Sequence, residues 1–168
     1  GRLYSQLALP EKFIILSPNH TGSGEPFSIM PRGLWELPMG TAEIDEGLST
    51  RFMKNCTLLR EDSLAHQSEH ALEVQIPFLQ YLKTKFWFVP LTLMHISYDH
   101  CEKVGKALTK TVRESGEEIL LIASSDMNHY ESQEVADRKD HLAIDQILSL
   151  DPKGLYETVK REGISMCG

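Results

Sequence analysis

The sequence is poor in cysteine and has no long apolar run. Its three cysteines, Cys56, Cys101 and Cys167, are far apart and show no Cys-x-x-Cys spacing. An odd, scattered set of this kind indicates neither a disulfide framework nor a zinc knuckle, and it fits a reducing cytoplasm. No apolar stretch approaches the ~20 residues that a membrane span needs, so we expect no membrane partner. The first residues also lack the pattern of a signal peptide.

Positive charge is scarce as well. Lysine and arginine total 17 against 24 acidic residues, which gives a net charge of −7. Without a basic stripe, this balance argues against nucleic acid as a partner. The apolar fraction of 41% and the charged fraction of 24% are ordinary for a soluble protein. We therefore expect a single domain over residues 1–168 with a substantial core.

Polar clusters follow two short apolar runs that have the character of buried strands. The first run, residues 13–16, leads to His20, and the second, residues 119–123, leads to Asp126 and His129. In open α/β sheets, ligands usually bind beyond the carboxyl ends of the strands. If both runs are parallel strands of one sheet, the three side chains meet at one rim. A lone histidine there is more often a loop residue that bonds to the backbone, but two such clusters favour a site.

Helices and strands alternate along the rest of the chain, which predicts a three-layer α/β/α fold with a mostly parallel or mixed sheet. The hydrophobic periodicity and the capping residues predict helices at 46–55, 98–114, 132–148 and 151–160, and a helix tail at 2–9. Strands are predicted at 57–59 and 86–94. The glycines and prolines of residues 34–45 predict an irregular segment there.

Residues 63–76 carry an unusual set of ionisable side chains. The pattern predicts a helix over 63–76, which Pro77 would break or kink, and a second helical segment over 78–83. Helical spacing would put His66, Glu69, His70 and Glu73 on one face. Such a face is either solvated or the wall of a site. The segment also fits H-x-x-E-H, in which two histidines bind zinc and the glutamate acts as general base. A zinc metallopeptidase is therefore one alternative, although it would need a third ligand and a large substrate chamber.

Several motifs in order resemble one known family. They are Pro18-Asn19-His20-Thr21-Gly22, Glu69-His70-x-x-Glu73-x-Gln75-x-Pro77-Phe78, Ser124-Ser125-Asp126-x-x-His129-Tyr130 and Cys167-Gly168. Each is weak alone, but together they resemble the Memo family, the B component of the AmmeMemoRadiSam set. The resemblance runs through nearly the whole chain.

The resemblance implies a fold similar to that of the class III extradiol ring-cleaving dioxygenases, which use non-haem iron in an α/β/α core. It also implies a metal site of two histidines and one cysteine, with His20 and Cys167 among the ligands and Asp126 and His129 as the neighbouring acid and base. The other histidine belongs to a Pro-His-Ala-Gly-Tyr motif expected before Gly1. We therefore expect the family domain to extend beyond this chain at both ends.

The ligand chemistry agrees with this resemblance. Imidazole and thiolate suit iron(II), copper(I) or zinc better than magnesium or calcium, and we expect iron(II). We assign Glu69, His70 and Glu73 to positions behind the ligands, and His66 to the surface. The expected function is that of a metal-dependent, dioxygenase-like oxidoreductase acting on a small molecule. A non-catalytic protein that binds a ligand or peptide in the same cleft is a further alternative.

Overall fold

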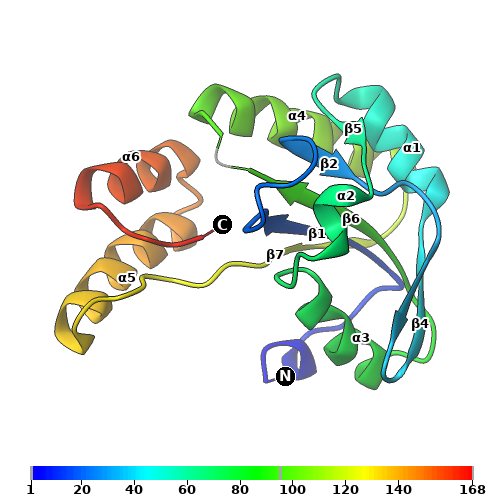
Figure 1. Cartoon of the computed structure of the whole chain (residues 1–168), viewed down its shortest axis with the longest axis horizontal. Helices are drawn as coiled ribbons and strands as arrows, with labels where there is room; N and C mark the ends of the chain where they lie inside the picture. The colour runs from blue at the N-terminus through cyan, green and yellow to red at the C-terminus, as the bar shows by residue number, and fades with distance from the viewer. Residues whose placement is uncertain (1, 95, 168) are drawn as a thin grey trace. The chain divides into compact units, whose positions relative to one another are not determined.

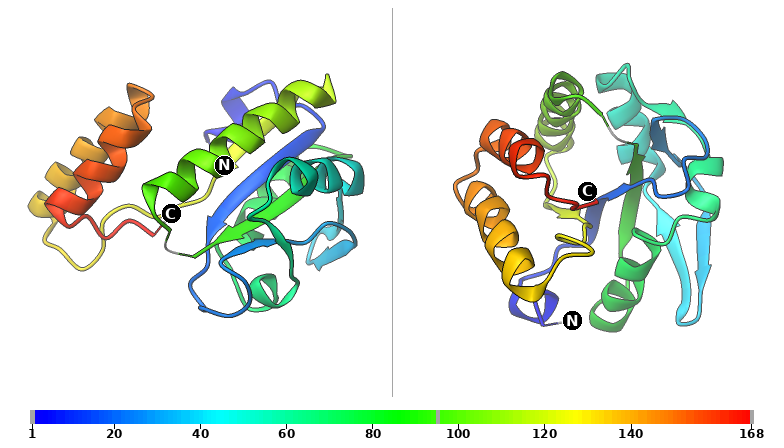
Figure 2. Two further views of the ribbon diagram at one scale, coloured as in Figure 1. Left: turned by 90° about the horizontal axis from the view of Figure 1, so that it is seen from above. Right: turned by 60° about the vertical axis from the view of Figure 1, so that its left-hand side comes forward.

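The structure, a computed structural model, describes residues 2–94 and 96–167. The chain divides into two compact units, Gly1–Ser124 and Ser125–Gly168. The first unit holds the sheet and most of the helices. The second unit holds two further helices, α5 and α6, which lie side by side in both views of Figure 2.

The strands of the first unit are, in chain order, β1 (Lys12–Pro18), β2 (Phe27–Ile29), β3 (Leu34–Leu37), β4 (Gly40–Ile44), β5 (Arg60–Glu61), β6 (Trp87–Leu93) and β7 (Ile119–Ala123). Its helices are the 3-10 turns η1 (Tyr4–Gln6) and η2 (Glu73–Gln75), together with α1 (Glu46–Asn55), α2 (Leu64–Gln67), α3 (Ile76–Leu82) and α4 (Tyr98–Ser115). The helices of the second unit are α5 (Gln133–Leu148) and α6 (Pro152–Glu162).

The centre of the sheet is parallel. β1 lies between β6 and β7 and runs parallel to both (Figure 1). β4 is parallel to β6 and continues the sheet, while β3 and β2 pair antiparallel with β4 and β6. β5 pairs with β2. The predicted mixed sheet is thus confirmed, and the carboxyl ends of β1 and β7 lie at the same edge.

Helices cover both faces of this sheet. Successive side chains of β1 point to opposite faces, so Phe13 and Ile15 join one core cluster while Ile14 joins the other. The first cluster includes side chains from η1 and α3, and the second includes side chains from α1 and α4. Figure 2 shows α4 running along its face of the sheet. The first unit is therefore a three-layer α/β/α structure, as predicted.

Local signals fix several elements as predicted. Asp45 caps α1 by accepting the N–H of Leu48 at 2.8 Å, and Asp151 caps α6 by accepting the N–H of Gly154 at 2.8 Å. Gly116 ends α4 in the left-handed conformation, with φ of 67°. β7 and α1 have the predicted bounds, and α4, α5 and α6 lie within two residues of theirs.

We predicted an irregular segment at 34–45, and this prediction is wrong. The segment forms the β3–β4 hairpin. Leu37 pairs with Gly40 across a two-residue turn. Gly40 has φ of 115°, a conformation that side chains disfavour. The glycines and prolines of this segment therefore mark a hairpin between short edge strands. Smaller differences occur at 2–9, where only the turn η1 forms, and at 57–59, where the short strand begins later as β5.

The continuous helix predicted for residues 63–76 is also wrong. α2 ends at Gln67, and Ser68 leaves the helical conformation with φ of −127° and ψ of 14°. Beyond it, the carboxylate of Glu69 accepts the N–H of Ala71 at 2.9 Å. Side chains that bond to nearby backbone in this way compete with helical hydrogen bonds. The chain resumes as η2 and then α3, which begins with Pro77 in its first turn.

No helix in the described part of the chain combines the length and apolar character needed to cross a membrane.

In the second unit, Ser132 caps α5 by accepting the N–H of Val135 at 3.4 Å, and Gly163 ends α6 with φ of 57°.

Candidate functional site

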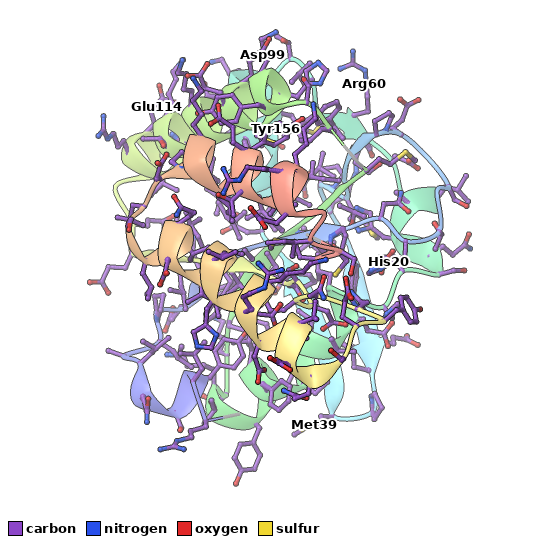
Figure 3. The ribbon with its side chains drawn as sticks, turned by 90° about the vertical axis from the view of Figure 1, so that its left-hand side faces the viewer. His20, Met39, Arg60, Asp99, Glu114 and Tyr156 are labelled. Carbon is purple, nitrogen blue, oxygen red and sulfur yellow. The ribbon has the colours of Figure 1, made fainter. Side chains whose placement is uncertain are left out.

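His20 lies on the loop that follows β1, at the carboxyl edge of the sheet (it is labelled in Figure 3). The preceding residue, Asn19, anchors this loop by donating its N–H to the carbonyl of Leu93 in β6 at 2.7 Å. Its side chain then folds the loop back: Oδ1 accepts from Thr21 N, Thr21 Oγ1 and Gly22 N, and Nδ2 donates to Ser23 O. Asparagine is suited to such turns because its side chain bonds to nearby backbone.

Glu69 holds the imidazole of His20. Its Oε1 lies 2.8 Å from Nδ1 of His20, and its Oε2 accepts the backbone N–H of the same residue. The Glu69 side chain is 1% exposed. Burial raises the pKa of this carboxyl, but the hydrogen bonds from the His20 ring, from Ala71 N–H and from His20 N–H outweigh it, so the net direction is downward. A carboxylate ion therefore faces the His20 ring from the protein interior.

His70 lies against the same group. Its ring stacks on that of His20, with centroids 5.0 Å apart and an interplanar angle of 19°. Nδ1 of His70 is 3.6 Å from Oε1 of Glu69, and its side chain is 72% exposed. Within the described residues, donor atoms of His20, Glu69 and His70 all lie within 4.8 Å of one another. The first unit thus gathers three of the predicted site residues.

Glu73 is placed differently. It lies on the turn η2 and is exposed. Among the described residues, the group of close donor atoms includes Glu69 and His70 but not Glu73. Its predicted role behind the ligands stays a prediction without a contact to support it.

His66 is buried, so its predicted surface position is wrong. Its Nδ1 lies 3.0 Å from Oγ1 of Thr92 in β6. Burial lowers the pKa of His66 to about 4, although the negative charge of Asp62 opposes this shift. Because α2 ends at Gln67, His66 and exposed His70 do not share a helix face as H-x-x-E-H zinc binding requires.

The second unit brings together the other predicted residues. The N–H of Asp126 donates to Sγ of Cys167 at 3.1 Å, and the N–H of Cys167 donates to the Asp126 carbonyl at 3.3 Å. Nε2 of His129 lies 3.6 Å from Oδ2 of Asp126. Cysteine binds metals through this sulfur atom, as the thiolate.

The tautomer of His129 follows from its partner. Nδ1 lies 2.7 Å from the carbonyl oxygen of Ser165, which only accepts, so Nδ1 carries a proton. In the neutral ring, Nε2 is then the basic nitrogen, and it is the one beside Asp126. This is the ring nitrogen that could accept a proton in general base catalysis.

The prediction that His20 lies near Asp126 and His129 depends on the order and direction of the strands in the sheet. β1 and β7 are parallel neighbours, and Ser124 donates its N–H to the carbonyl of Leu16 at 2.8 Å. Both strands therefore deliver their following loops to one edge of the first unit. Asp126 and His129 belong to the second unit, so their approach to His20 stays a prediction.

Known proteins are similar to this chain over almost its whole length. A family model described as Memo-like protein matches residues 1–168. The chain belongs to the Memo-like family. This membership confirms the resemblance carried by the motifs around His20, Glu69, Asp126 and Cys167.

Archaeal relatives of this Memo-like chain are similar along almost all of it. A MEMO1 family protein of Pyrobaculum arsenaticum is 40% identical over 169 residues, covering 99% of this chain and 60% of the relative. One from Caldivirga maquilingensis is 39% identical over 159 residues, covering 95% and 56%. One from Methanococcus maripaludis is 43% identical over 159 residues, covering 92% and 56%. The chain thus spans about 60% of the length of such relatives.

Proposed function

We propose that this Memo-like protein binds a transition metal through His20 and Cys167 and supports metal-dependent oxidoreductase chemistry on a small molecule. The observation that carries the proposal is the contact between buried Glu69 and Nδ1 of His20 at 2.8 Å. Metal-binding histidines commonly donate their second ring N–H to a carboxylate, which fixes the tautomer and makes the ligand more basic. Glu69 would leave Nε2 of His20 as the coordinating nitrogen.

The donor set fits a borderline or soft metal. Imidazole from His20 and thiolate from Cys167 suit iron(II) best, with copper(I) and zinc as further candidates. The N–H of Asp126 donates to the Cys167 sulfur at 3.1 Å, and a bound metal would hold that sulfur as the thiolate. Bound iron(II) would supply the electrons and the open coordination positions that redox chemistry needs.

Asp126 and His129 would move protons during turnover. His129 is the base, because Nδ1–H bonded to the Ser165 carbonyl leaves Nε2 to accept a substrate proton. Asp126, 3.6 Å from that nitrogen, would stabilise the imidazolium that forms. A non-catalytic protein would need the same metal-coordinating residues to bind its small molecule, but it would need no proton transfer. Loss of His129 therefore separates the two functions.

Metal binding by the purified protein tests this proposal. Anaerobically prepared protein is loaded with iron(II), copper(I) or zinc, and its affinity is measured by competition with a chromophoric chelator. We expect His20→Ala to lose binding, while His100→Ala, which removes a histidine of α4, keeps the wild-type affinity. Unchanged affinity in His20→Ala would reject the proposal.

Alkylation of cysteines gives a second readout. We expect metal to protect Cys167 from iodoacetamide and to leave labelling of exposed Cys101 unchanged. Equal labelling of Cys167 with and without metal would remove it from the ligand set.

A further inference from the structure

His70 is the least explained member of the donor group in the first unit. It is 72% exposed and yet lies over the His20 ring at a centroid separation of 5.0 Å. An exposed histidine whose side chain is simply solvated needs no such neighbour. Here its Nδ1 shares Oε1 of Glu69 with the His20 ring, at 3.6 Å against 2.8 Å. One buried carboxylate therefore organises two imidazoles.

We propose that His70 is itself a ligand, which adds a second imidazole to the metal held by His20. The inference rests on the proposed function, because it takes a metal on His20 as its starting point. Glu69 then has one role for both rings: its negative charge lies behind them and offsets the charge of the ion.

The distances are close to those that a shared ion requires. Metal–nitrogen bonds of ~2.0–2.1 Å place two nitrogens on one ion about 3.0–3.4 Å apart. The donor atoms of the group already lie within 4.8 Å of one another. His20 is fixed by Glu69 through both its ring and its backbone N–H, whereas exposed His70 has room to rotate about its side-chain bonds. We therefore expect the His70 ring, rather than the His20 ring, to turn toward the ion when it binds.

The chemistry of the donors also favours this role over a carboxylate ligand. Glu69 Oε1 already accepts from Ala71 N–H and contacts the His20 ring. Binding an ion through that oxygen would break contacts that shape the turn between α2 and η2. The contacts described for the His70 side chain are those with the Glu69 carboxylate and the His20 ring, so coordination by His70 has a lower structural cost.

The test measures cobalt(II) and zinc binding to the whole chain in His70→Asn. The matched control is His141→Asn, which removes an exposed histidine of α5. Loss of an outer partner usually weakens metal affinity ~10–100-fold, so we expect loss of a ligand to exceed about 100-fold. X-ray absorption should show one imidazole fewer on cobalt(II) in His70→Asn and no change in the control. Thermal unfolding verifies that both variants are folded.

The outcomes separate this inference from the function on which it rests. If His20→Ala loses metal while His70→Asn keeps the wild-type number of imidazoles, His70 is not a ligand and the proposed function stands. A modest loss of affinity with an unchanged number of imidazoles has the same meaning. If His20→Ala keeps its metal, the proposed function fails, and the inference fails with it.

Discussion

Buried His66 makes the stability of this protein depend on pH. Its pKa is about 4 in the folded chain, against 6.5 for an ordinary histidine, because burial disfavours the charged ring. Above pH 6.5 both states are neutral and the group has no effect. As the pH falls from 6.5 to 4, only the unfolded chain takes up a proton, so the folded state loses stability.

We expect this loss to approach about 3 kcal/mol near pH 4, since each unit of pKa difference is worth ~1.4 kcal/mol. The measurement is urea unfolding at pH 7 and at pH 4.5. His66→Asn should reduce the difference between the two pH values, whereas exposed His141→Asn should leave it as in the wild type. An equal difference in all three proteins would show that other groups set the acid sensitivity.

Glu69 and Glu73 offer a matched pair of carboxylates four residues apart. Glu69 is buried against His20, and Glu73 is exposed on η2. We expect Glu69→Gln to weaken zinc affinity ~10–100-fold, the usual effect of losing a carboxylate behind a ligating histidine. Glu73→Gln should bind zinc as the wild type does. Competition with a chelator measures both, and equal affinities would place Glu69 in a purely structural role.

At the scale of single residues, motifs in the sequence pointed to three residues whose donor atoms lie close together, but they did not predict how these residues are arranged. His20, Glu69 and His70 were identified from motifs. Their contacts depend on a turn that the helical pattern of residues 63–76 concealed. His66 shares that pattern, and its burial beneath Thr92 of β6 is a tertiary contact that no local signal reports.

Two glycines in the loop after His20 differ in what surrounds them. Both have positive φ, 65° at Gly22 and 77° at Gly24. A Cβ on Gly22 would meet open space, whereas one on Gly24 would clash with the Asp62 carboxylate and lie 2.8 Å from Ala65 N. The first substitution therefore costs only backbone strain, and the second adds a clash.

We expect Gly22→Ala to lower the free energy of unfolding by about 1 kcal/mol, the cost of a side chain in this region. Gly24→Ala should lower it by about 2–4 kcal/mol, because overpacking adds ~1–3 kcal/mol to the backbone strain. Denaturant melts measure both variants. Similar losses would mean that Asp62 and α2 shift to admit the methyl group.

At the scale of elements, prediction succeeded where the signal is local. Asp45 and Gly116 mark the start of α1 and the end of α4 in the sequence itself. The β3–β4 hairpin was missed because its strands are short and its partner β6 is about 45 positions away. A proline inside a strand usually indicates an edge strand or a bulge, but β6 is an interior strand. Pro90 falls between the residues of β6 that pair with β4 and those that pair with β2.

The two units differ in how much apolar surface they bury. The first holds two core clusters on either side of β1. In the described part of the second, only Ala143, Thr158 and Ile164 are buried. Local opening is easiest where few apolar contacts must be broken.

Hydrogen exchange followed by mass spectrometry should therefore be slowest in β1 and β6 and clearly faster in α5 and α6. Peptides from α4, a helix of the first unit that is similar in length to α5, give the exchange rate against which α5 is compared. Equal protection of α4 and α5 would show that the second unit is stabilised by contacts beyond its own small core.

The carboxylate that orients His20 also gives the chain its turn between α2 and η2. If the proposed metal binds, folding and metal binding are coupled by mass action, because only the folded chain presents the Glu69–His20 pair. An ion at a hundred times its dissociation constant adds ~2.7 kcal/mol to the stability of the state that binds it. Under that proposal, the melting temperature of the chain would rise with the concentration of free metal around it.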